Sequence, residues 1–181
     1  MRVIGGEARG RRLVAPELES LRPTSDRVRE AIFDILEARG LVEGASVLDL
    51  YAGSGALGIE ALSRGAASCT FVDSDRRAVA AIGANLDAVG LGGRPGVEVV
   101  RAEALAWLSA SPAPVDLGLV DPPYRFEEWP RLLELLPARV AVLEHGRPLE
   151  VAGRFDTLRR YRYGGTLVTL VAQHPTDKDP V

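Results

Sequence analysis

The chain has 181 residues, of which 46% are hydrophobic and 26% are charged, and its formal net charge is −3. One cysteine and two histidines exclude an internal disulfide framework and argue against a Cys- or His-rich metal centre, so we expect no bound metal. No apolar run approaches the ~20 residues of a membrane span and the N-terminus lacks a signal-peptide stretch, so we expect a soluble, cytoplasmic, single-domain protein with no membrane contact.

Arginines make up 21 of the 22 basic residues, and they gather in two places. Residues 1–30 carry seven arginines against five acids, and residues 154–162 carry four arginines against one aspartate. Local positive patches can contact nucleic-acid phosphates even in a protein that is acidic overall. Solvated surface arginines would produce the same pattern, so both readings stay open at this point.

The first forty residues are expected to precede the main fold as an extension. Two short strands, Arg2–Ile4 and Arg11–Ala15, flank a turn that contains three glycines, which is the pattern of a β-hairpin. Three N-capping residues, at positions 24–26, then precede apolar residues at helical spacing, and Gly40 ends this helix.

From residue 46 onward, apolar strands alternate with helices. Strands are expected over 46–51, 69–72, 97–101, 115–120 and 140–144; helices are expected just before residue 65, after a cap at Ser74 or Asp75, over 103–109 and over 128–136. This alternation predicts a doubly wound α/β fold, in which helices cover both faces of a parallel sheet. Right-handed crossovers place the carboxyl ends of the strands at one edge, where ligands bind.

The last part of the chain breaks this rhythm. Residues 154–163 and 166–172 are strand-like, and only two glycines separate them, so they are expected to form an antiparallel hairpin. The predicted organisation is an extension over 1–40, a core domain over 41–173 and a disordered polar tail over 174–181.

The first motif that carries chemistry follows the strand at 46–51. Gly53, Gly55 and Gly58 match G-x-G-x-x-G between a strand and a helix, where glycines let the backbone approach a ligand. A dinucleotide site has the same pattern, and a tight turn without a ligand is the plainer reading. Asp49 at the strand end would repel a pyrophosphate and suits a positive ammonium group, such as that of S-adenosylmethionine. Asp73 ends the second strand, where it can accept from ribose hydroxyls.

The second motif is Asp121-Pro122-Pro123-Tyr124, directly after the fourth strand. The prolines fix the backbone and remove two N–H donors, so the loop presents acceptors. The Asp121 carboxylate and the Pro122 carbonyl can accept from one NH₂ group, while Tyr124 offers a ring on which a planar base can stack. The set suits an exocyclic amine on a nucleobase, although Asp-Pro-Pro can also simply end a strand.

Together these motifs resemble those of class I S-adenosylmethionine-dependent methyltransferases that act on nucleobase amines. The stretches 2–6, 9–11, 22–30, 58–66 and 163–164 are similar to the bacterial 16S rRNA guanine-N2 methyltransferase family called RsmD, and the resemblance covers residues 1 to about 172. It implies a mostly parallel seven-stranded sheet with an antiparallel last strand. It also implies a 16S rRNA substrate within an assembled or assembling small ribosomal subunit. We expect the protein to be a monomer.

The resemblance also implies a set of site residues. The S-adenosylmethionine site would comprise Asp49, Tyr51, Gly53, Gly55, Asp73, Glu103 and Ala104, with Glu103 standing where many relatives have aspartate near the adenine. Asp121, Pro122 and Tyr124 would be catalytic, localising the amine lone pair and holding a flipped-out or unpaired base. Arginines that could hold RNA phosphates are Arg9, Arg11, Arg12, Arg22 and Arg27.

Three other functions fit parts of this pattern. A DNA adenine-N6 or cytosine-N4 methyltransferase would share Asp121–Tyr124, but such enzymes usually need a larger target-recognition region. An NAD-dependent oxidoreductase is disfavoured by Asp49 and by the second motif. An RNA-binding assembly factor with weak catalysis is disfavoured because both motifs are intact. Cys69 is expected in the core, and His145 is expected to be structural.

Overall fold

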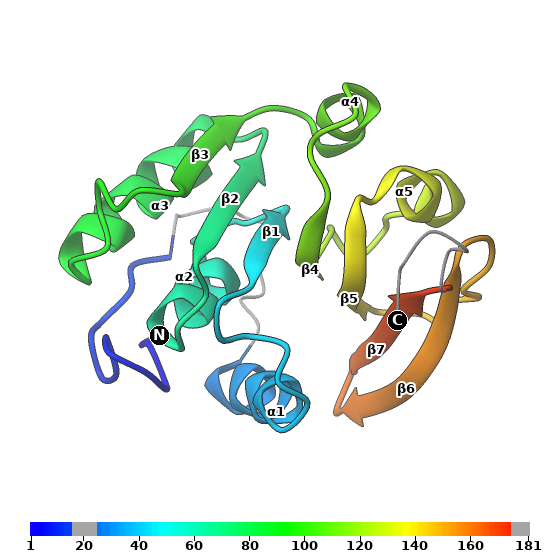
Figure 1. Ribbon diagram of the computed structural model, residues 1–181, viewed down its shortest axis with the longest axis horizontal. Helices are drawn as coiled ribbons and strands as arrows, with labels where there is room; N and C mark the ends of the chain where they lie inside the picture. Colours follow the sequence, from blue (N-terminus) through cyan, green and yellow to red (C-terminus); the bar gives the residue numbers. More distant parts are fainter. Residues whose placement is uncertain (16–24, 175–181) are drawn as a thin grey trace.

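The computed structural model describes residues 1–15 and 25–174, and its central feature is one seven-stranded sheet (Figure 1). The strands are β1 (Ser46–Leu50), β2 (Ser68–Asp73), β3 (Val97–Arg101), β4 (Val115–Val120), β5 (Ala138–His145), β6 (Phe155–Tyr163) and β7 (Thr166–Gln173). The helices are α1 (Asp26–Glu37), α2 (Ala56–Ser63), α3 (Arg76–Ala88), α4 (Ala104–Ser109) and α5 (Trp129–Leu135).

The strand order is β3-β2-β1-β4-β5-β7-β6. β1 to β5 pair in parallel, and β7 runs antiparallel to both of its neighbours, β5 and β6. This confirms the predicted α/β sheet with an antiparallel last strand and the predicted hairpin around Gly164 and Gly165. Because β1 and β4 are adjacent in the sheet but not in the chain, the order reverses between them, which is where open α/β sheets place their ligands.

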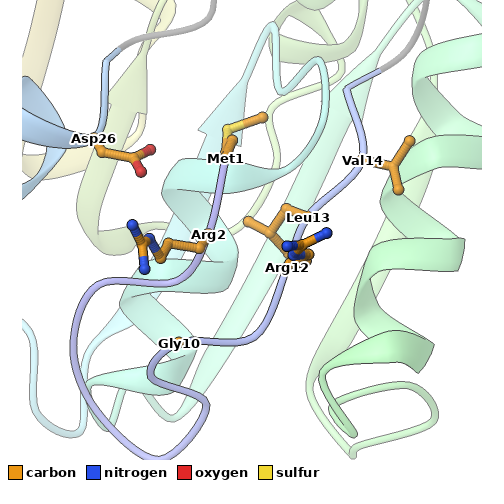
Figure 2. A pocket seen from close by; sticks show the side chains of 7 residues that line it. All are labelled: Met1, Arg2, Gly10, Arg12, Leu13, Val14 and Asp26. Atoms are coloured by element: carbon orange, nitrogen blue, oxygen red, sulfur yellow. The ribbon is translucent and has the colours of Figure 1, made fainter.

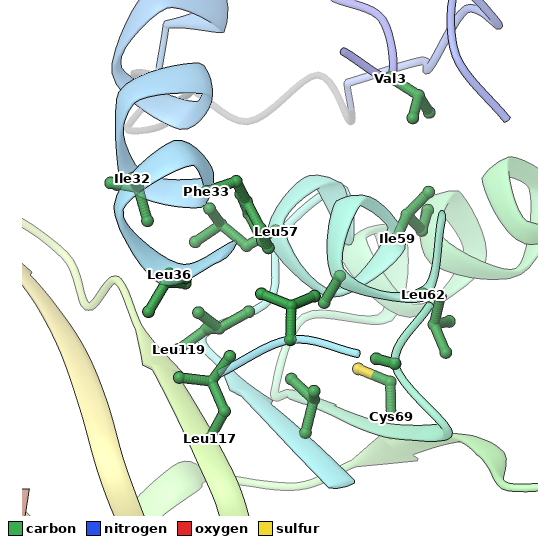
Figure 3. Close-up of a cluster of buried hydrophobic side chains, with 14 of the residues drawn as sticks. Val3, Ile32, Phe33, Leu36, Leu57, Ile59, Leu62, Cys69, Leu117 and Leu119 are labelled. Atoms are coloured by element: carbon green, nitrogen blue, oxygen red, sulfur yellow. The ribbon is translucent and has the colours of Figure 1, made fainter. Parts of the chain in front are cut away.

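Side chains that alternate along the strands pack into two hydrophobic cores, one on each face of the sheet. Cys69, Phe71 and Leu117 belong to the core covered by α1, α2 and α3, part of which Figure 3 shows, and Cys69 is fully buried as expected. Leu48 and Leu143 belong to the core covered by α4 and α5. Burying one such large apolar side chain stabilises the fold by roughly 1.5–3 kcal/mol. The two cores therefore attach a layer of helices to each face of the sheet.

Three helices begin at residues whose side chains cap them. Ser25 accepts from the Val28 N–H and starts α1; Asp75, and not Ser74, starts α3. Glu103 starts α4 by accepting from two backbone N–H groups. These caps satisfy donors that the helix itself leaves free, and they explain why the helices start where N-capping residues stand in the sequence.

The N-terminal segment keeps a short part of the predicted hairpin. The expected strands Arg2–Ile4 and Arg11–Ala15 pair through one antiparallel bridge, between Arg2 and Arg12. The Val3 N–H donates to the Arg11 carbonyl at 3.0 Å, and the Leu13 N–H donates to the Met1 carbonyl at 3.1 Å. A two-stranded hairpin alone is marginally stable in water, and other backbone donors of the segment find partners on α2. The N–H groups of Ile4 and Gly5 donate to the Glu60 carboxylate at 2.8 Å, and the Glu7 N–H donates to the Ser63 carbonyl at 2.8 Å.

Gly6 lets this segment lie against α2. Its φ is +73°, and a Cβ at this position would stand 1.7 Å from the Ser63 carbonyl oxygen. Val3, Ala8 and Leu13 are 1%, 1% and 5% exposed and join the core beneath α1, α2 and α3. The N-terminal backbone is therefore built into the core layer; the predicted domain boundary at residue 40 stays a prediction.

Within residues 1–15 and 25–174, none of the helices combines the length and the apolar character that a membrane crossing requires. Of the residues singled out in the sequence, Arg22 and the tail from residue 175 onward lie outside the described residues.

Candidate active site

The Gly-rich loop connects the carboxyl end of β1 to the start of α2. Tyr51, Gly53 and Gly55 have positive φ angles of 60°, 57° and 76°, so the chain turns sharply at the edge of the sheet. Such a conformation is costly for a tyrosine, and residues held in this way cluster at functional sites. Gly58 has another role: a Cβ there would stand 2.3 Å from the Phe71 ring, so glycine lets α2 pack closely on β2.

Asp49 lies beneath this loop and is 1% exposed. Its Oδ2 accepts from the Gly58 N–H at 2.8 Å, which ties the strand to the first turn of α2. Burial raises the pKa of Asp49 well above its ordinary value, and the negative charges of Asp121 and Asp73 raise it further, against the lowering effect of the Gly58 hydrogen bond. A cation bound at this edge would relieve that repulsion.

Asp73, at the end of β2, holds the loop from the other side. One carboxylate oxygen accepts from the Gly53 N–H at 2.8 Å, and the other accepts from the Asp75 N–H at 2.9 Å. A carboxylate has about four acceptor positions, so Asp73 keeps capacity for a ligand hydroxyl.

Glu103 and Ala104 stand at the start of α4. The two Glu103 carboxylate oxygens accept from the N–H groups of Leu105, at 3.1 Å, and Ala106, at 2.7 Å, while Ala104 is buried. The longer side chain of glutamate therefore caps α4, and its exposed carboxylate also faces solvent beside the loop after β3.

Tyr51 carries a polar atom that the fold leaves unsatisfied. Its hydroxyl is buried and has no hydrogen-bond partner among the described residues. Its ring meets the edge of Phe126 at 5.5 Å between centroids. Burial raises the pKa of Tyr51, as do the charges of Glu103 and Glu128, so the hydroxyl is protonated and can donate. Buried hydroxyls without partners are rare, and this one points to a ligand acceptor.

The loop after β4 brings the second motif to the same edge. The Asp121 N–H donates to the Leu50 carbonyl at 3.4 Å, so Asp121 follows β4 directly beside the end of β1. Pro122 is buried, whereas Tyr124 is 61% exposed. The structure thus brings Asp121 close enough to Asp49 for their charges to interact.

Tyr124 is held by two segments that sequence analysis did not connect with it. Its hydroxyl donates to the Gly165 carbonyl in the β6–β7 turn at 2.9 Å. A Cβ on Gly146, just after β5, would stand 2.3 Å from Cε1 and 2.4 Å from Cζ of the ring. Gly146 therefore lies against the ring, which still presents a large exposed area. The only signal in the sequence was the presence of glycines at these two positions.

The candidate RNA-binding arginines of the N-terminal segment, Arg9, Arg11 and Arg12, are exposed, and the segment contacts both ends of α2. The backbone before Arg9 contacts Ser63, at the end of α2 remote from the Gly-rich loop. The segment then returns toward that loop, because the Val14 N–H donates to Asn85, whose side-chain amide donates to the Ser54 carbonyl. Arg11 also lies beside Gly90, which follows α3. Arg27 is exposed on the first turn of α1. The eight residues of α2 extend ~12 Å, which is the scale of the separation between the two edges.

A hollow of about 540 Å³ opens between the N-terminal segment and the start of α1 (Figure 2). Met1, Arg2, Arg12 and Asp26 are among the residues that line it. Neither Asp49 nor Asp121 belongs to its lining, so it is distinct from the site at the carboxyl edge of the sheet.

The chain is similar to proteins of one family over nearly its whole length. The family described as "Conserved hypothetical protein 95" matches residues 1–171. Ribosomal RNA small subunit methyltransferase D of Escherichia coli (strain K12) is 42% identical over 137 residues, which cover 74% of this chain and 67% of that protein.

Two further similarities extend over both partners almost completely. The Bacillus subtilis (strain 168) protein YlbH is 38% identical, with 94% of this chain and 97% of that protein covered. The solved structure of the Escherichia coli protein yhhF has a TM-score of 0.84 and 32% identity, covering 97% of this chain and 99% of that chain. The sheet described above is therefore the class I methyltransferase fold.

Proposed function

Because this chain belongs to the family described as "Conserved hypothetical protein 95", the family of the RsmD-type methyltransferases, we propose that it methylates the exocyclic N2 amine of a guanine in 16S rRNA. The methyl donor is S-adenosylmethionine, and the substrate is RNA within the assembled or assembling small subunit. The observation that carries this proposal is the position of Asp121 beside the end of β1, with Tyr124 in the same loop, at the edge where the strand order reverses.

The residues at this edge fit a cationic cofactor. The carboxylates of Asp73 and Asp121 repel the negative charge of Asp49, and burial disfavours that charge further. A positively charged ligand group is therefore favoured at this edge of the sheet. The unpartnered Tyr51 hydroxyl is a free donor beside the same loop. Asp73 would accept from the ribose and Glu103 and Ala104 would contact the adenine, while Gly53 and Gly55 let the backbone approach. When bound, S-adenosylmethionine supplies an electrophilic methyl group.

The residues of this chain then position the acceptor. The N2 lone pair of guanine is conjugated with the ring and is a poor nucleophile. Hydrogen bonds from N2–H to the Asp121 carboxylate and the Pro122 carbonyl would localise that lone pair and aim it for in-line transfer. Asp121 would also stabilise the positive charge that develops on the nitrogen. The proton leaves the nitrogen after transfer, so no strong general base is assigned.

Tyr124 would stack on the target base. One side of its ring lies against Gly146, and the exposed part is available to a base that has left its helix. Stacking on an aromatic residue contributes ~1–3 kcal/mol, which offsets part of the few kcal/mol that flipping costs. The N-terminal arginines would hold phosphates of the same substrate. The cytoplasm is the compartment in which that substrate occurs.

Asp121 provides the direct test. Asp121→Ala should lower turnover by about 100-fold or more, because oriented electrostatic contacts to a transition state have this magnitude. Calorimetry should give unchanged cofactor affinity, since Asp121 contacts the acceptor. The assay offers labelled S-adenosylmethionine with small subunits, naked 16S rRNA and duplex DNA, and then maps the methylated atom. Methylation of DNA adenine or cytosine, or wild-type turnover by Asp121→Ala, would refute the proposal.

A further inference from the structure

The arginine cluster near the C-terminus lies on strand β6, and the strand register brings it to the catalytic edge. Val120 at the end of β4 is level with Leu143 of β5, and His145 of β5 is level with Leu167 of β7. The β6–β7 turn therefore projects past the carboxyl ends of the parallel strands. The hydrogen bond from the Tyr124 hydroxyl to the Gly165 carbonyl joins this turn to the proposed catalytic loop.

A β-bulge decides which way the side chains of β6 face. The register shifts between Thr157 and Arg159, which leaves Leu158 as the extra residue. Phe155 belongs to the core on the α4–α5 face, but Tyr161 packs against the core on the opposite face. Bulges change the direction of side chains in this way next to functional sites. After the bulge, Arg159 and the two tyrosines share one face.

The segment after the bulge combines positive charge with aromatic rings. Arg159, Arg160 and Arg162 are exposed, while the rings of Tyr161 and Tyr163 are nearly parallel, at 17°, with centroids 6.4 Å apart. Arg160 donates to the Leu149 carbonyl at 3.3 Å, and Arg162 donates to the Gly164 carbonyl at 3.2 Å. Both guanidinium groups thus donate to neutral backbone oxygens.

Arg154, the fourth arginine of the cluster, is used by the fold. It donates to the Leu136 carbonyl, and its guanidinium lies 5.6 Å from the centroid of the Phe155 ring. The single acid of this strand, Asp156, lies before the bulge and is paired with His174 at 3.1 Å. The stretch 159–163 therefore contains three positive charges and no negative one, in a chain whose net charge is −3.

We propose that Arg159, Arg160 and Arg162, with Tyr161 and Tyr163, form an RNA-binding surface around the edge strand β6 for the nucleotides that flank the target base. Arg159 and the two tyrosines lie on one face of this strand, and Arg160 and Arg162 lie on the other. This inference rests on the proposed function, because it uses the position of the base at Tyr124. Five residues of extended strand cover ~16 Å, so the surface runs from the catalytic edge along a short single-stranded stretch. Arginines would contact phosphates, which position the substrate, and the tyrosine rings offer stacking area.

The test compares two triple variants that remove the same charge. The first is Arg159→Ala, Arg160→Ala and Arg162→Ala; the matched control replaces three other exposed arginines with alanine, at Arg39, Arg131 and Arg139. Binding of small subunits and of naked 16S rRNA is measured over a salt series. Three lost phosphate contacts should weaken binding at least tenfold and flatten the plot of log affinity against log salt by about 2–3. The control should retain the wild-type slope.

Two further measurements separate binding from folding and from chemistry. The β6 triple variant should keep the wild-type Tm and cofactor affinity, and its KM for the subunit should rise while kcat at saturation is retained. Wild-type affinity, KM and slope would overturn the inference, as would an equal loss in the control. Weaker binding with an unchanged salt slope would also overturn it, because the lost contacts would then not be with phosphates. If the wild-type protein methylates no RNA, the proposed function fails instead, whatever the binding measurements over the salt series show.

Discussion

Three aspartates, Asp49, Asp73 and Asp121, stand at the carboxyl edge of the sheet, and each has a different environment. Asp49 is buried under the Gly-rich loop, Asp73 accepts two backbone N–H groups, and Asp121 follows β4 on the more open side. Their charges repel one another, and burial makes Asp49 the most affected. At the scale of single residues, the site is therefore under electrostatic strain that a cationic ligand would relieve.

Cofactor binding should be linked to a proton on Asp49. Above the ordinary aspartate pKa of 3.8 and below its own raised pKa, folded Asp49 keeps a proton that the unfolded chain has lost. The stability contributed by this proton is complete at low pH and is lost as pH rises through the raised pKa. A cation favours the carboxylate, so binding should release a proton within that window and become tighter as pH rises.

Calorimetry of S-adenosylmethionine binding in buffers with different ionisation enthalpies measures this proton directly. Asp49→Asn keeps an acceptor for the Gly58 N–H and should abolish the released proton. Proton release that is unchanged in Asp49→Asn would assign the effect to another group.

Gly146 should act on the reaction through Tyr124. A methyl group on Gly146 would stand 2.3 Å from the ring and must displace it, so Gly146→Ala should lower kcat by roughly 10- to 100-fold. In a Tyr124→Ala background the same substitution should have little further effect, because no ring remains to be moved. Tyr124→Phe should be milder, since it loses one hydrogen bond, worth ~0.5–1.5 kcal/mol, and keeps the ring.

Single-turnover rates of the four variants of this cycle provide the measurement. Effects of Gly146→Ala that are equal in the two backgrounds would show that Gly146 acts independently of Tyr124.

At the scale of elements, α2 connects the site with the N-terminus. Its first turn receives Asp49 through Gly58, and its last turns hold the N-terminal backbone through Glu60 and Ser63. Glu60 is fully buried, and it also pairs with Arg64 at 2.7 Å and with the buried Arg29 at 3.6 Å. One helix thus connects the Gly-rich loop with the anchor of residues 1–15.

Glu60→Gln should destabilise the fold strongly. The amide would direct a donor at groups that need an acceptor and would leave Arg29 and Arg64 without their buried counter-charge. Breaking one side of a buried ion pair costs ~3–5 kcal/mol, which corresponds to a fall in Tm of roughly 6–20 °C for a chain of this size. Thermal unfolding followed by circular dichroism measures the change, with the exposed Glu43→Gln as the control. A Tm equal to that of the control would exclude this anchor.

At the scale of the whole molecule, the two basic clusters belong to different parts of the fold. Arg9 follows the backbone that contacts Ser63 at the end of α2, whereas the turn after Arg159–Arg162 contacts Tyr124. Variants of the two clusters can therefore be tested separately for substrate binding.

Charge reversal at Arg9, Arg11 and Arg12 should weaken subunit binding and leave folding intact. The backbone of this segment is anchored through Glu60 and Ser63, and the three side chains are exposed, so Tm and cofactor affinity should be retained. Fewer phosphate contacts should flatten the salt dependence of binding. Measuring Tm and the salt slope on the same variant decides the matter: a lower Tm with a normal slope would assign these residues to packing alone.

The sequence by itself determined the sheet, the helices and the edge that carries the site. Strand and helix periodicities are local signals that can be read from the sequence. Because crossovers between parallel strands are right-handed, the carboxyl ends of β1, β2 and β4 must lie at the same edge of the sheet. The Asp49 and Asp121 motifs were located at that edge for the same reason. The helix starts at Asp26 and Arg76 followed from capping residues next to them in the chain, whereas the Glu103 cap of α4 was not predicted.

Only the tertiary structure decided how distant segments meet. Two short strands were expected at the N-terminus, and they pair only around Arg2 and Arg12. The N–H groups of Ile4 and Gly5 pair instead with Glu60, 56 and 55 positions away, because backbone donors next to the core need a partner. The Tyr124–Gly165 bond spans 41 positions, and the bulge at Leu158 turns the face of β6. Local periodicity contains no information on such contacts, since they depend on which surfaces the packed sheet brings together.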